Sequence, residues 1–266
     1  MAQGTRKYTG LLQDKLVLII GGTSGIGYAI AEAALENWAL VTVVGSNKSK
    51  LENALSQLRG SYPLETNNGH LRGIQADLSC AKSLEETVPT ILEYAADGAK
   101  INHLIITAAD MTVPPPIRDI TVQNIESTHT LRFLAPLILT KHLPRFMESN
   151  AENSVTLTSG AHGQKADPGW SVVAGYCGAI EGLMRGLAVE MKPIRFNVVS
   201  PGPIETQAVK DILGEHYDMA IKVAEQKALV GKVGRPENVA QAYLYFMKDQ
   251  FVNGTVLESN GGFLLT

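Results

Sequence analysis

The stretch LVLIIGGTSGIG, residues 16–27, decides how this chain folds. Its first five residues are apolar and partly β-branched, which is typical of a short buried strand. The glycine-rich segment GGTSGIG then opens an alanine-rich stretch of helical period from Tyr28 to Asn37. Glycines after a strand allow a tight turn and a close approach of backbone to a pyrophosphate, whose charge the helix N-terminus stabilises. The stretch therefore predicts a dinucleotide-binding turn, and the alternative is a glycine turn with a structural role only.

Apolar runs of strand length alternate with helical segments along the rest of the chain. Six further runs are rich in β-branched residues: 40–44, 71–76, 103–107, 154–159, 196–200 and 255–259. This alternation is typical of a parallel sheet with helices on both faces. No linker or composition break divides the sequence, so we expect one α/β domain over residues 1–266. The predicted architecture is a Rossmann fold with a doubly wound, seven-stranded parallel sheet, preceded by a flexible tail over residues 1–12.

The composition argues against several classes of protein. The chain has 266 residues, 45% of them hydrophobic, and a formal net charge of −3, which gives no field to attract nucleic acid. No secretory signal or membrane-spanning run is visible, so we expect a cytoplasmic protein without membrane contact. The two cysteines, Cys80 and Cys177, and the six histidines show no metal-ligand spacing. We therefore expect neither a disulfide framework nor a metal site.

The end of the second predicted strand indicates which dinucleotide binds. A carboxylate there hydrogen-bonds the ribose hydroxyls of NAD, whereas polar or basic groups accommodate the additional phosphate of NADP. This chain has Ser46, Asn47 and Lys48 and no acid at that point. NADP is therefore expected, the alternative being that Lys48 only begins a solvated helix. Asp77, after the third strand, suits an adenine amino group or a local capping role.

Further motifs make the chain resemble the short-chain dehydrogenase/reductase family over nearly its whole length. They are ADL at 76–78, TSG at 158–160, LAVEM at 187–191, RFNVVSPGPIET at 195–206, GRPENVAQA at 234–242 and NGTVLESNGG at 253–262. Ser159 takes the position of the serine of that family. With the glycine turn and the second strand, the resemblance implies a cofactor site of Gly21, Thr23, Ser24, Gly25, Ile26, Gly27, Ser46, Asn47, Lys48, Asp77, Leu78, Ala108, Ala109, Pro201, Gly202, Ile204 and Thr206.

The sequence departs from this family at the positions that carry its chemistry. Ile20 replaces a threonine before the glycine turn, and TAAD at 107–110 replaces NNAG. Arg132 takes the place of the family's asparagine, and Val173 and Cys177 take the places of its tyrosine and lysine. Three of the four catalytic positions of the family are therefore changed.

These changes favour a different substrate class. Hydride addition to a ketone gives an alkoxide, a strong base that needs a positioned proton donor. An iminium ion is already cationic, and hydride addition gives a neutral amine without compulsory proton transfer. Tyr176 is the alternative acid, but it points about 60° away from Val173 on a helix, and its own i+4 neighbour is Ile180. Cys177 is expected to be a small buried filler.

The segment AHGQKADPGW, residues 161–170, offers the groups that a cationic substrate needs. Asp167 can pair with the cation, and Trp170 can stack on a flat heteroaromatic ring. Arg132 is expected to face the same cavity, where it orients Asp167 or binds a substrate carbonyl. The alternatives are a structural Asp-Pro-Gly turn and a structural ion pair.

The proline-rich stretch DMTVPPPIRD, residues 110–119, together with Arg132, Asp167 and Trp170, resembles the fungal bifunctional reductase/Diels–Alderases of prenylated indole alkaloid pathways, the malbrancheamide and paraherquamide type. This resemblance implies NADPH reduction of a cyclic, tryptophan-derived iminium and an intramolecular cycloaddition that forms a bicyclic diazaoctane. The catalytic set is then Asp167, Arg132, Trp170 and Ser159. The wider family implies a homotetramer that pairs the helices expected at 121–148 and 172–191. The alternatives are a carbonyl reductase that uses Tyr176 and a non-catalytic NADP-binding protein.

Overall fold

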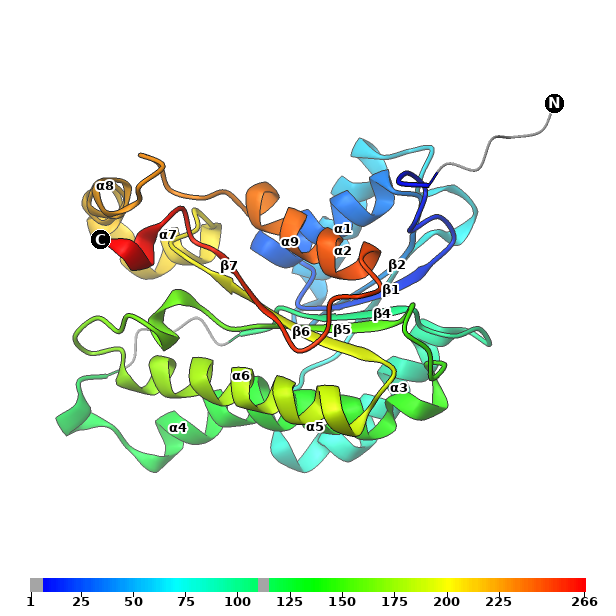
Figure 1. The fold of residues 1–266 in the computed structure, drawn as a ribbon, viewed down its shortest axis with the longest axis horizontal. Coiled ribbons are helices and arrows are strands. Elements are labelled where there is room, and N and C mark those ends of the chain that lie inside the picture. The colour runs from blue at the N-terminus through cyan, green and yellow to red at the C-terminus, as the bar shows by residue number, and fades with distance from the viewer. Residues whose placement is uncertain (1–6, 110–114) are drawn as a thin grey trace.

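Seven parallel strands form one sheet in the part of the chain that the structure describes, residues 7–109 and 115–266 of a computed structural model. Their order across the sheet is β3-β2-β1-β4-β5-β6-β7 (Figure 1), as in a doubly wound Rossmann fold. The prediction of the fold class is confirmed, and each predicted run matches a strand to within one residue at either end. The strands are β1 Leu16–Ile20, β2 Leu40–Gly45, β3 Leu71–Gln75, β4 His103–Ile106, β5 Ser154–Thr158, β6 Arg195–Pro201 and β7 Val256–Ser259.

Helices cover both faces of this sheet. Figure 1 shows α1, α2 and α9 on one face and α3, α4, α5 and α6 on the other, with α7 and α8 beside the C-terminal segment. The helices are α1 Gly25–Glu36, α2 Lys48–Ser61, α3 Leu84–Ala96, α4 Val122–His129, α5 Ala135–His142, α6 Ser171–Glu190, α7 Gln207–Leu213, α8 Tyr217–Lys227 and α9 Pro236–Lys248.

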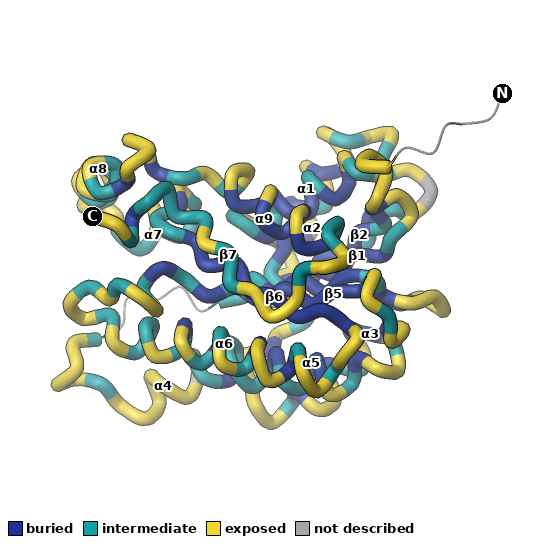
Figure 2. The backbone as a smooth tube through the Cα atoms, viewed as in Figure 1, coloured by how far each residue is buried: buried dark blue, intermediate teal, exposed yellow. Residues whose placement is uncertain are grey.

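Two hydrophobic cores lie on the two faces of the sheet, and β1 contributes to both. Leu18 and Ile20 pack with α3, α5 and α6, whereas Val17 and Ile19 pack with α1 and α9. Successive side chains of a strand point to opposite faces, so a strand buried on both sides is apolar throughout. Burial accordingly concentrates along the central strands (Figure 2).

Two expectations about the chain's organisation are wrong in part. Leu12, placed at the end of the flexible tail, is fully buried and belongs to the core beside α1, so the exposed part of the described tail ends at Leu11. The helix expected over residues 121–148 is interrupted by a π-helical turn, η4 (Thr130–Leu134), between α4 and α5. Pro136 has no N–H to donate to the preceding turn and its ring crowds that turn, which accounts for the widening.

Helix α6 is apolar enough to pass a length-and-composition test for a membrane span, although the sequence analysis found no such segment. It is the one helix among the described residues that does so, and 28% of the tested window is buried. Its residues Ile180, Met184 and Leu187 belong to the core on one face of the sheet. One side of α6 thus packs on the sheet, and the remaining residues of the helix are exposed or half-buried.

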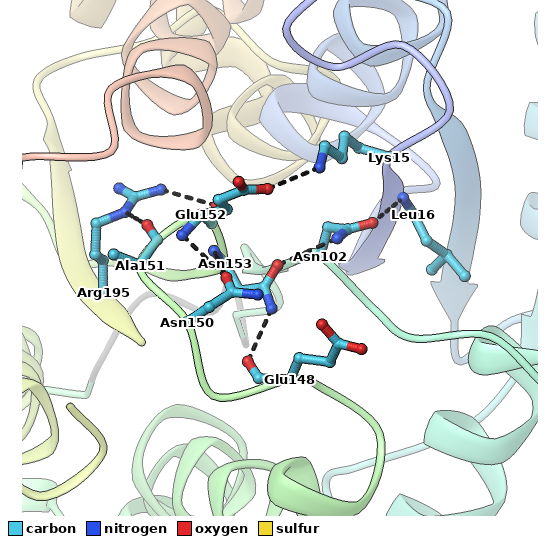
Figure 3. A network of polar contacts seen from close by, with 9 residues as sticks. All are labelled: Lys15, Leu16, Asn102, Glu148, Asn150, Ala151, Glu152, Asn153 and Arg195. Carbon is cyan, nitrogen blue, oxygen red and sulfur yellow. Dashed lines mark hydrogen bonds and ion pairs between the residues drawn. The ribbon is translucent and has the colours of Figure 1, made fainter. Parts of the chain in front are cut away.

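The amino ends of the strands are joined by a polar network (Figure 3). Asn102 accepts a hydrogen bond from the Leu16 amide at 2.9 Å and donates to the Asn153 side chain at 3.1 Å. The buried Arg195 donates to the backbone carbonyls of Ala151, at 2.6 Å, and Glu152, at 3.4 Å. This network joins the amino ends of β1, β4, β5 and β6. The glycine turn lies at the opposite, carboxyl ends of the strands, which remain open for ligands.

Candidate active site

The glycine turn follows β1, which is paired with β4 in the sheet. The chain leaves these two strands toward opposite faces of the sheet, and this opens the crevice where such sheets usually bind ligands. Gly21 has φ +90°, and a Cβ there would lie 2.7 Å from the Ala108 backbone nitrogen. Gly25 has φ +54°, and a Cβ on Gly27 would lie 2.2 Å from the Gly21 carbonyl oxygen. The turn and the start of α1 therefore require glycine at these positions.

The N-terminus of α1 is suited to an anion. Ser24 begins the helix in an extended conformation, and its side chain makes no capping hydrogen bond to the first turn. The first N–H groups of a helix lack intrahelical acceptors and carry the positive end of its dipole. The predicted residues Gly21, Thr23, Ser24, Gly25, Ile26 and Gly27 thus form a cradle that fits the pyrophosphate of a dinucleotide.

Polar groups follow β2, as the sequence predicts. Asn47 caps α2 by accepting a hydrogen bond from the Lys50 amide at 3.0 Å, and Ser46 is exposed beside it. The Lys48 ammonium lies 3.9 Å from Glu52 one turn along, and its side chain is 74% exposed. Lys48 is therefore a solvated residue at a helix start, the alternative noted above, and its contact with a phosphate stays a prediction.

Asp77 and Leu78, which follow β3 after one intervening residue, have local structural roles. The Asp77 carboxylate accepts a hydrogen bond from the Ser79 amide at 2.9 Å, which closes a local turn and caps no helix. Leu78 is 3% exposed and packs in the core. Contact of Leu78 with a cofactor would therefore involve its backbone, and adenine recognition by Asp77 stays a prediction.

A cavity of about 700 Å³ opens next to the glycine turn, and most of the predicted site residues line it. Four of them form the predicted catalytic set: Arg132, Ser159, Asp167 and Trp170. Seven belong to the predicted cofactor site: Ile26, Ala108, Ala109, Pro201, Gly202, Ile204 and Thr206. Of the proline-rich stretch, Asp110 to Pro114 lie outside the described residues. The fold thus brings segments from both halves of the chain to one cavity.

The positions of the family's tyrosine and lysine form apolar wall in this cavity. Val173 and Cys177 line it together with Ile180 from the same face of α6. Burial raises the pKa of the Cys177 thiol, and the nearby Arg132 guanidinium only partly opposes this. Cys177 is therefore a neutral filler, as the sequence predicts, and provides no reactive thiolate.

Tyr176 lies away from the cavity. Its hydroxyl donates a hydrogen bond to the Ile125 carbonyl at 3.3 Å, toward α4, and its ring is 6.0 Å from that of His129. Tyr176 is absent from the cavity lining, and burial raises the pKa of its phenol. These contacts argue against Tyr176 as the proton donor of a carbonyl reductase.

Asp167 belongs to a charged cluster on the cavity wall that includes two residues missed by the sequence analysis. Its carboxylate lies 3.8 Å from the Lys227 ammonium of α8 and 3.9 Å from His162 Nδ1. The His162 ring stacks on Trp170, with centroids 4.4 Å apart and an interplanar angle of 19°. Burial lowers the pKa of His162, although the nearby Asp167 opposes this shift.

Ser159 has a second partner that sequence reasoning missed. Its hydroxyl donates a hydrogen bond to Glu181 Oε1 at 3.3 Å, and the other carboxylate oxygen of Glu181 lies 3.6 Å from Arg185. Glu181 follows Cys177 by one helical turn. The helical spacing from the altered lysine position was therefore a sequence signal that could have identified Glu181. Across the described residues, no group of three or more His, Cys, Asp or Glu side chains is arranged to hold a metal ion.

Comparisons with known proteins agree with this geometry. The family model for an SDR-like Rossmann domain matches residues 8–266. The short-chain dehydrogenase/reductase malC of Malbranchea aurantiaca is 48% identical over 98% of this chain and 98% of its own. The short-chain dehydrogenase/reductase ATR9 of Stachybotrys chlorohalonatus is 37% identical over 96% of this chain and 98% of its own. A solved structure of the MalC reductase/Diels-Alderase superposes with a TM-score of 0.92 and covers 97% of this chain and 99% of that one.

Proposed function

Because the chain belongs to the short-chain dehydrogenase/reductase family, whose members are oxidoreductases, we propose that it reduces a cyclic, tryptophan-derived iminium with NADPH. We propose further that the same cavity directs an intramolecular Diels–Alder cycloaddition of a prenylated indole to a bicyclic diazaoctane. The observation that carries the proposal is the lining of the cavity. Asp167 and Arg132 line it, and Val173 and Cys177 take the positions at which the family has its tyrosine and lysine.

The residues of the cradle support NADPH as the cofactor. The α1 N-terminus and the three glycines fit the pyrophosphate, and Ser46, Asn47 and Lys48 offer polar and cationic groups to the additional phosphate. NADPH supplies the hydride when it is bound. Pro201, Gly202 and Thr206 line the same cavity as Asp167, which supports a nicotinamide bound beside the predicted catalytic set.

Asp167 supplies the negative charge that a cationic substrate needs. Its present counter-ion is Lys227 at 3.8 Å, so a bound iminium competes with this ammonium for the carboxylate. Trp170 and His162 form a stacked aromatic wall next to it, a surface on which a flat indole can lie. Arg132 provides a planar donor for a substrate carbonyl on the same cavity.

The size and apolar walls of the cavity support the cycloaddition. A pericyclic ring closure requires no acid or base, only a cavity that holds diene and alkene in one folded geometry, and such ordering is worth several kcal/mol. Val173, Cys177 and Ile180 on α6 and Ile212 and Leu213 on α7 give this cavity opposite apolar surfaces. The MalC protein, 48% identical to this chain, is described as a reductase/Diels-Alderase.

We also propose that the protein is a cytoplasmic homotetramer. The wider family pairs the two long helices that correspond here to α4–α5 and α6. On α6 a Cβ added at Gly175, Gly178, Gly182 or Gly186 would meet open space, and Val189 is 70% exposed. Such a face is available for close packing of a second helix.

Replacement of Asp167 tests the proposed function. Asp167→Asn keeps the size of the side chain and removes the charge, so NADPH oxidation with a cyclic indole iminium should fall about tenfold or more, since a contact to a charged group is worth about 1.5–3 kcal/mol. The assay follows NADPH absorbance and product stereochemistry. Asp14→Asn, at an exposed position with φ +59° that asparagine also adopts, is the matched control and should retain wild-type rates.

Two other outcomes separate the alternatives. Full activity of Asp167→Asn would contradict the role of Asp167 and, with loss of activity in Tyr176→Phe and turnover of simple ketones, would support the carbonyl reductase. A protein that binds NADPH but oxidises it with neither an iminium nor a ketone would support the non-catalytic alternative.

A further inference from the structure

Glu181 has two partners that give it a position in the site. Its side chain is 13% exposed, and it reaches from α6 to the Ser159 hydroxyl at 3.3 Å. Arg185, one turn further along α6, holds the other carboxylate oxygen at 3.6 Å and is itself 60% exposed. The carboxylate thus connects a cavity-lining serine to a cation near the protein surface.

This arrangement decides which part of the Ser159 hydroxyl faces the cavity. A serine hydroxyl has one hydrogen to donate and two lone pairs that accept. A carboxylate oxygen accepts, so the Ser159 hydrogen is directed to Glu181 and the lone pairs are left for a ligand. Ser159 is 7% exposed, so little water competes for its hydrogen. A substrate carbonyl oxygen needs a hydrogen-bond donor, but the Ser159 hydroxyl offers it only an acceptor.

We infer that Glu181 is a positioning residue that holds Ser159 as a hydrogen-bond acceptor and so selects substrates that bring a positive charge or an N–H group to it. The inference rests on the proposed function, because it explains how the site distinguishes a C=N⁺ group from a carbonyl. Asp167 lines the cavity, whereas Glu181 lies behind Ser159 and acts on a ligand through the Ser159 hydroxyl.

The test compares a cation with a neutral molecule of the same shape. The probes are N-methyl-3,4-dihydro-β-carbolinium and the neutral lactam of the same ring skeleton. Their binding is measured by titration calorimetry with NADP⁺ present, so that no reduction occurs. The variants are Glu181→Gln, Ser159→Ala and the double variant, and Glu190→Gln on the exposed side of the same helix is the control.

We expect Glu181→Gln to weaken carbolinium binding about tenfold and lactam binding less than about twofold, since the variant removes the negative charge behind Ser159 and only the cation is attracted by that charge. Ser159→Ala should show the same selective loss, and the double variant should be no weaker than either single variant, because the two residues act as one unit. With NADPH, the KM for the carbolinium should rise and kcat should not fall, since hydride transfer removes the charge that Glu181 favours and the lost attraction acts mainly on the bound cation. NADP⁺ affinity and the melting temperature should be unchanged in both single variants, as in Glu190→Gln.

Three results would overturn the inference: equal weakening of both probes, unchanged carbolinium binding in Glu181→Gln, or tighter binding of the lactam than of the carbolinium by the unchanged protein. If Glu181→Gln fails to fold, Ser159→Ala carries the test alone, since it removes only a hydroxyl. Failure of the proposed function would appear differently. NADPH would not be oxidised with the carbolinium, although Glu181→Gln still reduced its binding selectively.

Discussion

Gly27 shows how closely the cofactor cradle is built at the level of single atoms. A Cβ at this residue would lie 2.2 Å from the Gly21 carbonyl oxygen and 2.6 Å from the Thr107 hydroxyl. Thr107 itself hydrogen-bonds the Ile20 and Gly21 carbonyls, both at 3.2 Å. The first turn of α1 is therefore pressed against β1 and the end of β4, which aims its N–H groups into the crevice.

Gly27→Ala should destabilise the protein and weaken NADPH binding together. The added methyl has no space, so the start of α1 must shift, at a cost of about 1–3 kcal/mol in the free energy of unfolding. Urea unfolding with and without NADPH measures both effects. Gly60→Ala is the control because Gly60 lies in α2 with open space around its Cβ position, and it should stabilise by about 0.5–1 kcal/mol. Equal stability of Gly27→Ala and wild type would contradict this account of the turn.

His103 makes the stability of the fold depend on pH. Its ring accepts or donates a 2.9 Å hydrogen bond with Ser154, and burial next to Arg195 and Lys15 lowers its pKa to about 3. The ring is thus neutral in the folded protein, whereas the unfolded chain binds a proton below a pKa of about 6.5. The free energy of unfolding therefore falls as the pH drops from 6.5 toward 3.

His103→Asn should remove this part of the pH dependence. At pH 7.5 the variant should be less stable than wild type, and the difference should shrink by about 2 kcal/mol at pH 5, because only wild type then loses stability to protonation of the unfolded chain. Urea midpoints at the two pH values measure it. A difference that does not change with pH would show that His103 titrates normally in the fold.

At the level of elements, α8 closes the cavity through an ion pair with the opposite loop. Lys227 ends the helix 3.8 Å from Asp167, and its ammonium lies 5.7 Å from the Phe263 ring. The Thr266 hydroxyl donates to the Lys227 carbonyl at 2.9 Å. Helix, loop and C-terminal segment thus meet at one end of the cavity, where Figure 1 shows α8 beside the C-terminus.

Lys227→Met should increase affinity for a cationic ligand. The methionine keeps the apolar stem of the side chain, and loss of the ammonium leaves Asp167 without this counter-ion, so carbolinium binding should tighten about three- to fivefold at low salt. Calorimetric titration at about 20 mM and about 300 mM salt, where the Debye length is about 20 Å and about 6 Å, measures the gain and its screening. Lys222→Met, on an exposed position of α8, is the control and should bind like wild type. Weaker binding in Lys227→Met would mean that the ammonium itself contacts the ligand.

At the level of the whole molecule, the proposed tetramer is tested by measuring the molecular mass of the protein in solution. Light scattering should give about four times the chain mass of 28.6 kDa. Val189→Glu, on the exposed face of α6, should give a smaller species because a charge is expensive to bury in a helix interface. Leu64→Glu, an equally exposed residue before β3, should leave the mass unchanged. A monomer in the unchanged protein would contradict the tetramer and leave the cavity chemistry intact.

The sheet was predictable because its signal is local. Each strand is a short apolar run, and a run such as residues 16–20 is apolar at every position because both of its faces are buried. The break between α4 and α5 was missed although Pro136 marks it, since helical periodicity continues through the π-helical turn. Leu12 was missed because two adjacent leucines, Leu11 and Leu12, show no period in an otherwise polar segment.

The sequence by itself determined the dinucleotide turn, the sheet and the absence of the tyrosine and lysine, since each depends on neighbours in the chain. Only the tertiary structure brought Lys227 and His162 to Asp167 and turned Tyr176 toward α4. Such contacts depend on how helices and loops pack across the sheet, and packing distances are not encoded in local spacing. For the same physical reason Glu181 was recognisable as the partner of Ser159 only once α6 lay against β5.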